Sequence, residues 1–459
     1  MTDRALATVQ NGVRFFLRRE ARQSFAQFRF ESRLWMVALM HFCASAYLGF
    51  SQIAAFTTAI EGLPQEHLWR VFFAAGVVQL ITSWTSRKQS ATGWSTDGFR
   101  RVGIRSSVFW FVMFCLSGLV AFQAGGAWRQ AFIYLIFIGA TSISISILVR
   151  TLEIIWELCT AAEIKQMSGL NSSAYAAGQL FSGLIPYFLV QAHYYPLVCI
   201  GLLLTLMLVS RWTMKRFADR APSTSVGEKD SEVSLPLGRL GIVYCMLVVC
   251  SVAAARIFEF GLSLEVNRAA FSQEEIARVF GAVAVVANAV ILILAIFNVQ
   301  PILLRKLGFS GALLLYPMIL LPFVLWWSLG GGDILIVALC VCLDSTFSTA
   351  LYTPGRMAAL RVFTPSWRTK LAQLESAALR PMAMLLPLTL IFWGASPRAI
   401  GLGVTLLIVV LVFLLAKMSF QVLHKRLNAD KNDTDALDLF VFPLLLAFQR
   451  LRQVPGATK

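Results

Sequence analysis

The chain has 459 residues, of which 58% are hydrophobic and only 14% are charged, and its formal net charge is +16. A soluble domain carries about 25% charged residues because its surface faces water, so this composition excludes an ordinary soluble protein. The basic residues flank apolar runs and do not form one patch, which argues against nucleic-acid binding and indicates contact with anionic lipid.

The chain begins with an arm over 1–33 that mixes arginines with phenylalanines, a pattern typical of an amphipathic helix on a membrane surface. A membrane-spanning helix needs about 20 mostly apolar residues. Twelve runs meet this need, and a tail over 421–459 follows them, so the sequence predicts an all-α polytopic membrane protein. The predicted spans are 34–56, 68–85, 106–124, 131–149, 172–191, 195–211, 240–262, 278–300, 308–329, 333–354, 371–394 and 398–420.

Lysine and arginine are concentrated in the arm and in the loops after the second, sixth, eighth and tenth spans. Because basic loops stay on the cytoplasmic side, this alternation predicts that both termini are cytoplasmic. A polar linker over 214–239 divides the spans into a first bundle, 34–213, and a second bundle, 240–420. We expect a multi-pass protein of the bacterial inner membrane.

The two halves repeat each other at an offset of about 200 residues, which is the layout of parallel six-helix repeats. After the second span, the segment 93–103 carries a glycine, an aspartate and two arginines, and resembles the signature loop of the major facilitator superfamily. One position is deleted and the usual second glycine is absent. The resemblance implies twelve transmembrane helices in two six-helix parallel pseudo-repeats. It also implies a gating loop formed by Asp97, Arg100, Arg101 and, in the reduced second copy, Arg305 and Lys306.

A narrower resemblance covers about forty residues that begin at Asp344 and include Tyr352, Pro354 and Arg356. This stretch is similar to the bacterial and plastid ATP/ADP translocase-like family, whose members exchange nucleotides as antiporters. The first span lacks the lysine-rich start of such exchangers. Nucleotide transport is therefore kept as a special case of the transporter hypothesis.

Charged side chains inside spans are costly, so they usually face a cavity or a partner. In the major facilitator layout the first, fourth, seventh and tenth spans line the central cavity. Arg256 and Asp344 lie on the seventh and tenth of these spans, and the first span contributes two polar side chains. The substrate-binding candidates are therefore Arg256, Asp344, His41 and Gln52.

Five further charges are candidates for coupling or for a structural role: Glu259, Glu375, Arg380, Arg150 and Glu153. Arg150 and Glu153 lie at the inner end of the fourth span, where water can solvate them. Asp344 and Arg380 lie at matching depth on sequential spans, so we expect their side chains to form an ion pair directly or through a water.

These observations predict a secondary active transporter that moves a small anionic or zwitterionic solute by alternating access, with Asp344 or Glu375 carrying a coupling proton. The alternatives are a membrane-embedded enzyme, such as a lipid-linked transferase, or a non-transporting scaffold subunit. The short loops and the absence of an HExxH sequence favour no enzyme activity, no cofactor and no metal. We expect a monomer whose partners are the lipid bilayer, the solute and a coupling proton, without nucleic acid.

Overall fold

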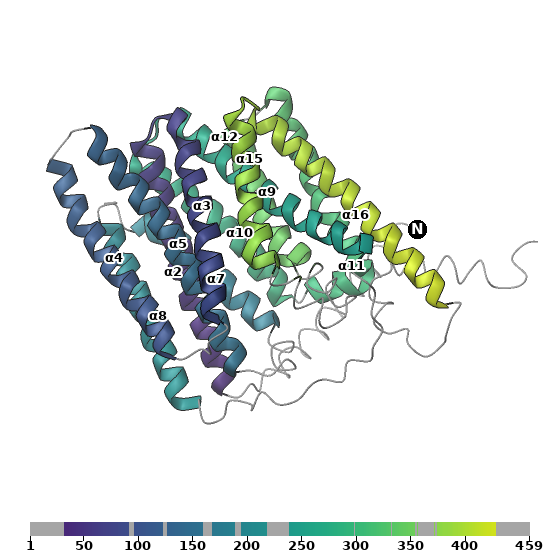
Figure 1. Ribbon diagram of the computed structural model, residues 1–459, viewed down its shortest axis with the longest axis horizontal. Coiled ribbons are helices and arrows are strands. Elements are labelled where there is room, and N and C mark those ends of the chain that lie inside the picture. The colour runs from purple at the N-terminus through teal and green to yellow at the C-terminus, as the bar shows by residue number, and fades with distance from the viewer. Residues whose placement is uncertain are drawn as a thin grey trace, which may run out of the picture.

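The computed structural model describes residues 32–90, 96–122, 126–158, 168–188, 194–217, 238–297, 299–331, 333–353, 356, 371 and 374–427. Helices make up nearly all of this part of the chain, which contains no strand (Figure 1). The predicted arm, most of the linker and most of the tail lie outside the described residues.

The helices follow the twelve predicted spans in order. The first six are α2 (Ser32–Gly62), α3 (Gln65–Ser90), α4 (Thr96–Phe122), α5 (Gly126–Leu158), α7 (Ser168–Phe188) and α8 (Tyr195–Phe217). The second six are α9 (Gly238–Arg268), α10 (Gln273–Ile296), α11 (Val299–Trp326), α12 (Ile334–Phe347), α15 (Arg380–Phe392) and α16 (Pro397–Leu427). Three π-helical segments extend α11, α12 and α15: η3 (Trp327–Gly331), η4 (Ser348–Tyr352) and η6 (Glu375–Leu379).

Most helices are longer than the apolar runs that predicted them. The described part of the segment expected as a gating loop is helical instead, because α4 begins at Thr96 and α11 begins at Val299. Asp97, Arg100, Arg101, Arg305 and Lys306 therefore lie within the first eight residues of these two helices. A span predicted from a run of apolar residues ends at the first charged residues. The helix itself continues into the polar interface, because it satisfies its own backbone hydrogen bonds. The extension of α5 past Arg150 to Leu158 was predicted and is confirmed.

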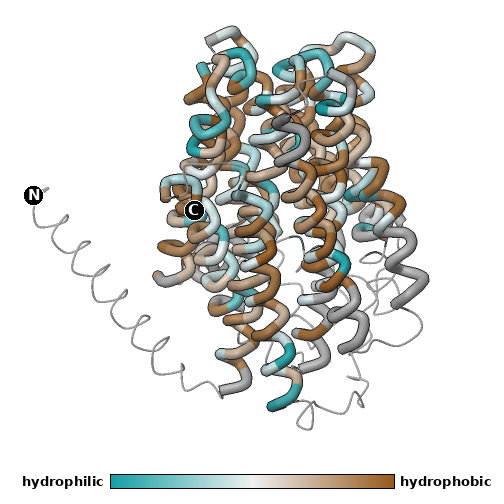
Figure 2. Tube along the Cα trace, turned by 90° about the vertical axis from the view of Figure 1, so that its left-hand side faces the viewer, coloured by the Kyte–Doolittle hydropathy of each residue, from teal (hydrophilic) through white to brown (hydrophobic). Residues whose placement is uncertain are grey.

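Seven helices of the described part are long and apolar enough to cross a membrane by length and composition. Two others, α4 and α15, contribute the shorter apolar stretches Val102–Leu116 and Arg380–Phe392. Figure 2 shows hydrophobic colour over much of the helix shafts, with hydrophilic colour at the upper ends and in shorter stretches along the shafts. The chain is an integral, multi-pass membrane protein.

The two halves pack their helices in the same way. In the first half α2 packs on α5, α7 and α8, while α4 packs on α5 and α8, and α3 packs on α5. In the second half α9 packs on α12, α15 and α16, while α11 packs on α12 and α16, and α10 packs on α12. The six pairings correspond one to one, so the predicted pair of parallel six-helix repeats is confirmed.

Small residues allow the central helices to approach closely. A Cβ atom added to Gly178 of α7 would lie 2.0 Å from Ser45 Oγ of α2, and one added to Gly183 would lie 2.7 Å from the Gly281 carbonyl oxygen of α10. Small residues at helix crossings are the usual device in membranes, where van der Waals packing drives helix association. The Gly183–Gly281 crossing joins the two repeats.

Hydrogen bonds join the two repeats at one end of the described bundle. We call this the distal end; it holds the turns 63–64, 269–272 and 393–396, and the opposite end is proximal. At the distal end Asn267 donates to the Ile60 carbonyl at 2.7 Å, and the Tyr187 hydroxyl donates to the Arg278 carbonyl at 3.3 Å.

Aromatic rings reinforce the closure at the distal end. Phe56 stacks on Phe280 with ring centroids 5.2 Å apart, and Trp69 lies 5.1 Å from Phe392. Each pair joins one repeat to the other, so the distal end is sealed by apolar packing as well as by hydrogen bonds.

Candidate solute site between the repeats

Polar side chains on one face of α2 point toward the second repeat. Phe56, one helical turn after Gln52, stacks on Phe280 of α10, so Gln52 lies on the face that meets the second repeat. Gln52 is exposed although α2 is surrounded by other helices. Asn267 of α9 donates to the carbonyl group of Ile60 in α2 and to that of Leu63, which follows α2. At a rise of about 1.5 Å per residue, Gln52 and Arg256 therefore lie within about 5 Å of the same depth.

Arg256 of α9 lies where the two repeats meet. Its guanidinium group binds the Glu259 carboxylate at 3.0 Å, donates to Met384 Sδ of α15 at 3.3 Å and lies 5.6 Å from the Phe72 ring centroid of α3. The Arg256 side chain is only 13% exposed, whereas Glu259 is 41% exposed. The two residues form an i, i+3 ion pair, and Phe72 adds a cation–π contact from the opposite repeat.

Asp344 does not meet Arg380. Its buried carboxylate accepts a short hydrogen bond from the Tyr316 hydroxyl of α11. The Tyr316 ring packs 4.9 Å from the Tyr352 ring of η4, and Tyr352 donates to the Leu247 carbonyl of α9 at 2.9 Å. The predicted Asp344–Arg380 pair is wrong, because equal depth does not fix the face of a helix to which a side chain points.

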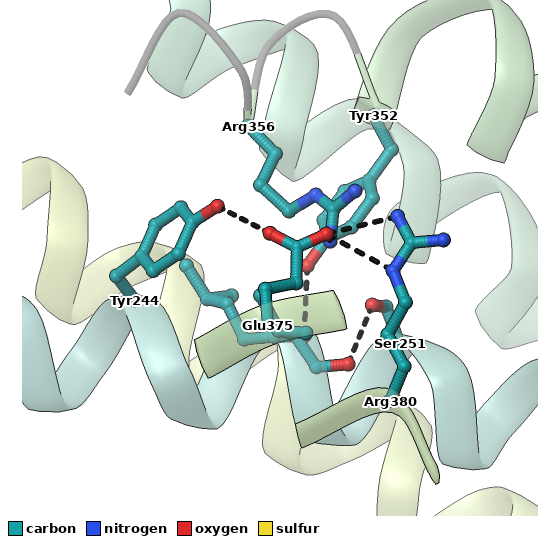
Figure 3. A network of polar contacts seen from close by, with 8 residues as sticks. Tyr244, Ser251, Tyr352, Arg356, Glu375 and Arg380 are labelled. Carbon is teal, nitrogen blue, oxygen red and sulfur yellow. Dashed lines mark hydrogen bonds and ion pairs between the residues drawn. The ribbon is translucent and has the colours of Figure 1, made fainter. Parts of the chain in front are cut away.

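Arg380 instead joins a buried network centred on Glu375. Arg356 and Arg380 both bind Glu375 Oε1, at 2.7 Å and 2.9 Å, and the Tyr244 hydroxyl donates to Oε2 at 2.7 Å. Figure 3 shows Tyr244 and Arg380 approaching the carboxylate from opposite sides. Arg356 and Glu375 are 4% and 8% exposed, whereas Arg380 is 46% exposed.

The backbone around this network departs from the ordinary α-helix. Tyr352 lies in η4 and Glu375 lies in η6, so π-helical segments bracket the network on both sides. Wider π turns shift the faces of the helix that follows and are frequent at functional sites. They also explain why α-helical spacing alone did not place Arg380 beside Glu375.

His41 occupies the corresponding region of the first repeat. Its ring lies 5.7 Å from the Tyr175 ring of α7, and Asn171 is a polar neighbour. His41 Nδ1 and Asn171 Oδ1 are buried without a well-formed hydrogen bond to any described group. Gln179, two turns after Asn171, donates to the Ser45 carbonyl at 3.0 Å.

Several predicted site residues fall where side chains are outside the described part of the structure: Arg150, Glu153, Asp97, Arg100, Arg101, Arg305 and Lys306. Their gating, coupling or structural roles stay predictions. Sequence reasoning missed Tyr316, Tyr244, Phe72 and Asn171. These aromatic and amide residues are neutral, so the search for charged residues inside spans did not select them. The offset between the repeats relates Asn171 to Glu375 and could have found Asn171.

A small cavity lies between the repeats near their proximal ends. Its volume is about 10 Å³, with room for about one water molecule, and it is lined by Ser172 of α7, by Thr349 and Ala350 of η4, and by three residues of α10.

The sequence matches no protein-family model and no curated protein. The structure resembles the peptide transporter POT in complex with sulfate, at 12% identity and a TM-score of 0.61 over 86% of this chain and 96% of that chain. It also resembles the xylose transporter XylE from E. coli in an inward open conformation, at 13% identity and a TM-score of 0.57 over 83% and 95%.

A third similar structure is the nucleoside transporter NupG, at 9% identity and a TM-score of 0.55 over 84% of this chain and 100% of that chain. The chain has the major facilitator fold. At these identities the likeness shows the fold alone. None of the comparisons tests the narrower resemblance to ATP/ADP translocase-like proteins, which stays a prediction.

Proposed function

We propose that this protein is a secondary transporter that moves a small solute with an anionic group by alternating access, with Arg256 as the principal solute-binding residue. The observation that carries the proposal is the position of Arg256, a largely buried cation in contact with side chains of both repeats. Charge inside a membrane protein is costly, and a functional role is the default explanation for it.

Rocking of the repeats would change the surroundings of Arg256. Glu259 and Met384 belong to the same repeat as Arg256 and would move with it, whereas Phe72 belongs to the other repeat. A solute carboxylate that replaces the Phe72 contact would therefore couple binding to the relative position of the repeats. Alternating access about a midplane site works in this way.

The contacts at the distal end form one of the two closures that alternating access requires. Asn267, Tyr187 and the Phe56–Phe280 stack close the distal side. The basic loops favour an orientation in which the proximal end faces the cytoplasm of a bacterial inner membrane. We infer a monomer whose proximal end opens toward the cytoplasm in one state of the cycle, as XylE does in its inward open conformation.

The chemistry of the site favours an anionic or zwitterionic solute. Arg256 supplies a planar fork that suits a carboxylate, Glu259 exposes an oxygen that suits an ammonium group, and Gln52 supplies an amide at the same depth. Solved neighbours with this fold carry peptides, a sugar or nucleosides, so the fold itself does not choose among these classes.

Asp344 is the better candidate for a coupling proton. Its carboxylate touches the neutral hydroxyl of Tyr316, whereas two guanidinium groups hold the Glu375 carboxylate. A carboxyl group without a paired cation can gain and lose a proton without breaking an ion pair.

Uptake by purified protein in liposomes tests the proposed function. Labelled amino acids, monocarboxylates, dicarboxylates and nucleotides would be offered to the wild type, to Arg256→Gln and to the control Arg268→Gln, which removes an exposed charge at the distal end. We expect uptake of at least one anionic or zwitterionic solute, its loss by about a hundredfold in Arg256→Gln, and little change in the control. Equal uptake in all three proteins would contradict the role of Arg256, and binding without transport would favour a scaffold.

A further inference from the structure

Positive charge exceeds negative charge around Glu375. Arg356 and Arg380 share one oxygen of a single carboxylate, and Tyr244 occupies the other oxygen without adding charge. One guanidinium charge is therefore left without a counterion among the described residues. Arg356 is nearly fully buried and Arg380 is 46% exposed, so the surplus charge is accessible at Arg380.

The exposed part of Arg380 faces the interior of the protein. The lipid face of α15 carries the exposed apolar side chains of Met382, Leu386 and Leu390, which follow one another at one-turn intervals. Arg380 precedes Met382 by two residues and so lies about 200° around the helix from that face. Met384, one turn after Arg380, touches Arg256. The two arginines therefore lie along one inner face, and Arg380 is about 6 Å from Met384 along the helix axis.

One nitrogen of Arg380 is available for a ligand. Nε and Nη2 both bind Glu375 Oε1, at 3.0 Å and 2.9 Å, and Nη1 points away from the carboxylate in Figure 3. Glu375 thus fixes the orientation of the guanidinium group before a ligand arrives. Such preorganisation lowers the entropy lost on binding.

We propose that Arg380 binds a second anionic group of the solute whose first anionic group is bound by Arg256. The solute class is then a small anion with two separated acidic groups, of which a dicarboxylate is the simplest. This inference rests on the proposed function, because it assigns the substrate class of the same site. A lipid headgroup is a poorer ligand, since the lipid face of α15 lies on the opposite side of the helix.

Binding of defined anions to the purified full-length protein tests this assignment. The protein would be placed in phosphatidylcholine nanodiscs, which contain no anionic lipid, and titrated calorimetrically with acetate, succinate and glutarate. The variants are Arg380→Gln, Arg380→Lys and Arg256→Gln, with Arg268→Gln as the control at the distal end. Thermal unfolding of each variant without ligand reports whether the fold survives the substitution.

We expect wild-type protein to bind a dicarboxylate at least tenfold more tightly than acetate. Arg380→Gln should remove this preference and leave acetate binding unchanged, and Arg380→Lys should restore part of it. Arg256→Gln should weaken binding of both classes. If Arg380→Gln does not fold, Arg380→Lys tests the inference instead, because lysine lacks the guanidinium fork. A preference for dicarboxylates in Arg380→Lys that equals the wild-type preference would overturn the inference.

The failure of this inference differs from the failure of the proposed function. Uptake that depends on Arg256 and shows equal affinity for mono- and dicarboxylates in wild type and Arg380→Gln would overturn the second anion site alone. An absence of Arg256-dependent binding for every anionic and zwitterionic probe would overturn both. A preference for dicarboxylates that persists in Arg380→Gln would also contradict the assignment of Arg380 as the second anion-binding residue.

Discussion

The two repeats share their packing but differ in their interior chemistry. The same six helix pairings occur in each repeat. Between α2 and α7 the first repeat places His41 beside Asn171, and between α9 and η6 the second repeat places Tyr244 against Glu375. These positions correspond, because 244 − 41 = 203 and 375 − 171 = 204. Neutral groups in one repeat are thus matched by an ion-pair network in the other.

This difference teaches that packing and chemistry are specified separately. Small residues such as Gly178 and Ser45 set the approach of the central helices in the first repeat. The intramembrane charges whose contacts are described, Arg256, Glu259, Asp344, Glu375 and Arg380, belong to the second repeat. The comparison predicts that substitutions at corresponding positions have larger effects in the second repeat.

The largest effect is expected at Glu375. In Glu375→Ala the nearly buried Arg356 keeps its charge without its partner, which should lower the free energy of unfolding by about 3–5 kcal/mol. Chemical denaturation in detergent measures this loss. The double substitution Glu375→Leu with Arg356→Leu should recover part of it, because the unpaired charge is then absent. An unchanged free energy of unfolding in Glu375→Ala would show that the network around Glu375 does not stabilise the fold.

A smaller effect on stability is expected at Tyr316 and Asp344. Tyr316→Phe leaves the buried Asp344 carboxyl without its hydrogen bond and should cost about 1–3 kcal/mol in the free energy of unfolding. Asp344→Asn keeps a polar partner for Tyr316 and should cost less.

The two substitutions separate structure from coupling. If Asp344 carries the coupling proton, Asp344→Asn abolishes accumulation driven by a pH gradient and preserves solute exchange across the same liposome membrane, while Tyr316→Phe retains both activities. Accumulation by Asp344→Asn at the wild-type level would show that the aspartate is only structural.

The smallest effect is expected at His41. Because its Nδ1 has no well-formed hydrogen bond within the described part of the chain, His41→Gln should change the free energy of unfolding by less than about 1 kcal/mol. Uptake should change only a few-fold. A complete loss of proton-driven accumulation in His41→Gln, with folding intact, would instead make the first repeat the coupling unit.

Sequence reasoning predicted the fold better than the site. The lengths of the apolar runs and the alternation of basic loops predicted the helices, because both signals are local in the sequence. The internal repeat predicted which helices pack together. The direction in which a side chain points around its helix was not predictable. Asp344 was therefore predicted to pair with Arg380, although it binds Tyr316. Arg356 was predicted as part of a basic loop, and its burial against Glu375 depends on the π-helical segments on either side.

The central claim is that the repeats alternately expose a site between them, and locking the distal end tests it most directly. Tyr187 of α7 and Arg278 of α10 meet there across the repeats, so Tyr187→Cys with Arg278→Cys allows a short thiol-reactive cross-linker to join them. Ser328→Cys with Arg398→Cys is the matched control, because this distal contact lies within the second repeat. The account predicts that cross-linking abolishes uptake by the first pair, that cleaving the linker restores it, and that the control pair keeps its uptake throughout. Wild-type uptake by the fully cross-linked Tyr187–Arg278 pair would contradict alternating access.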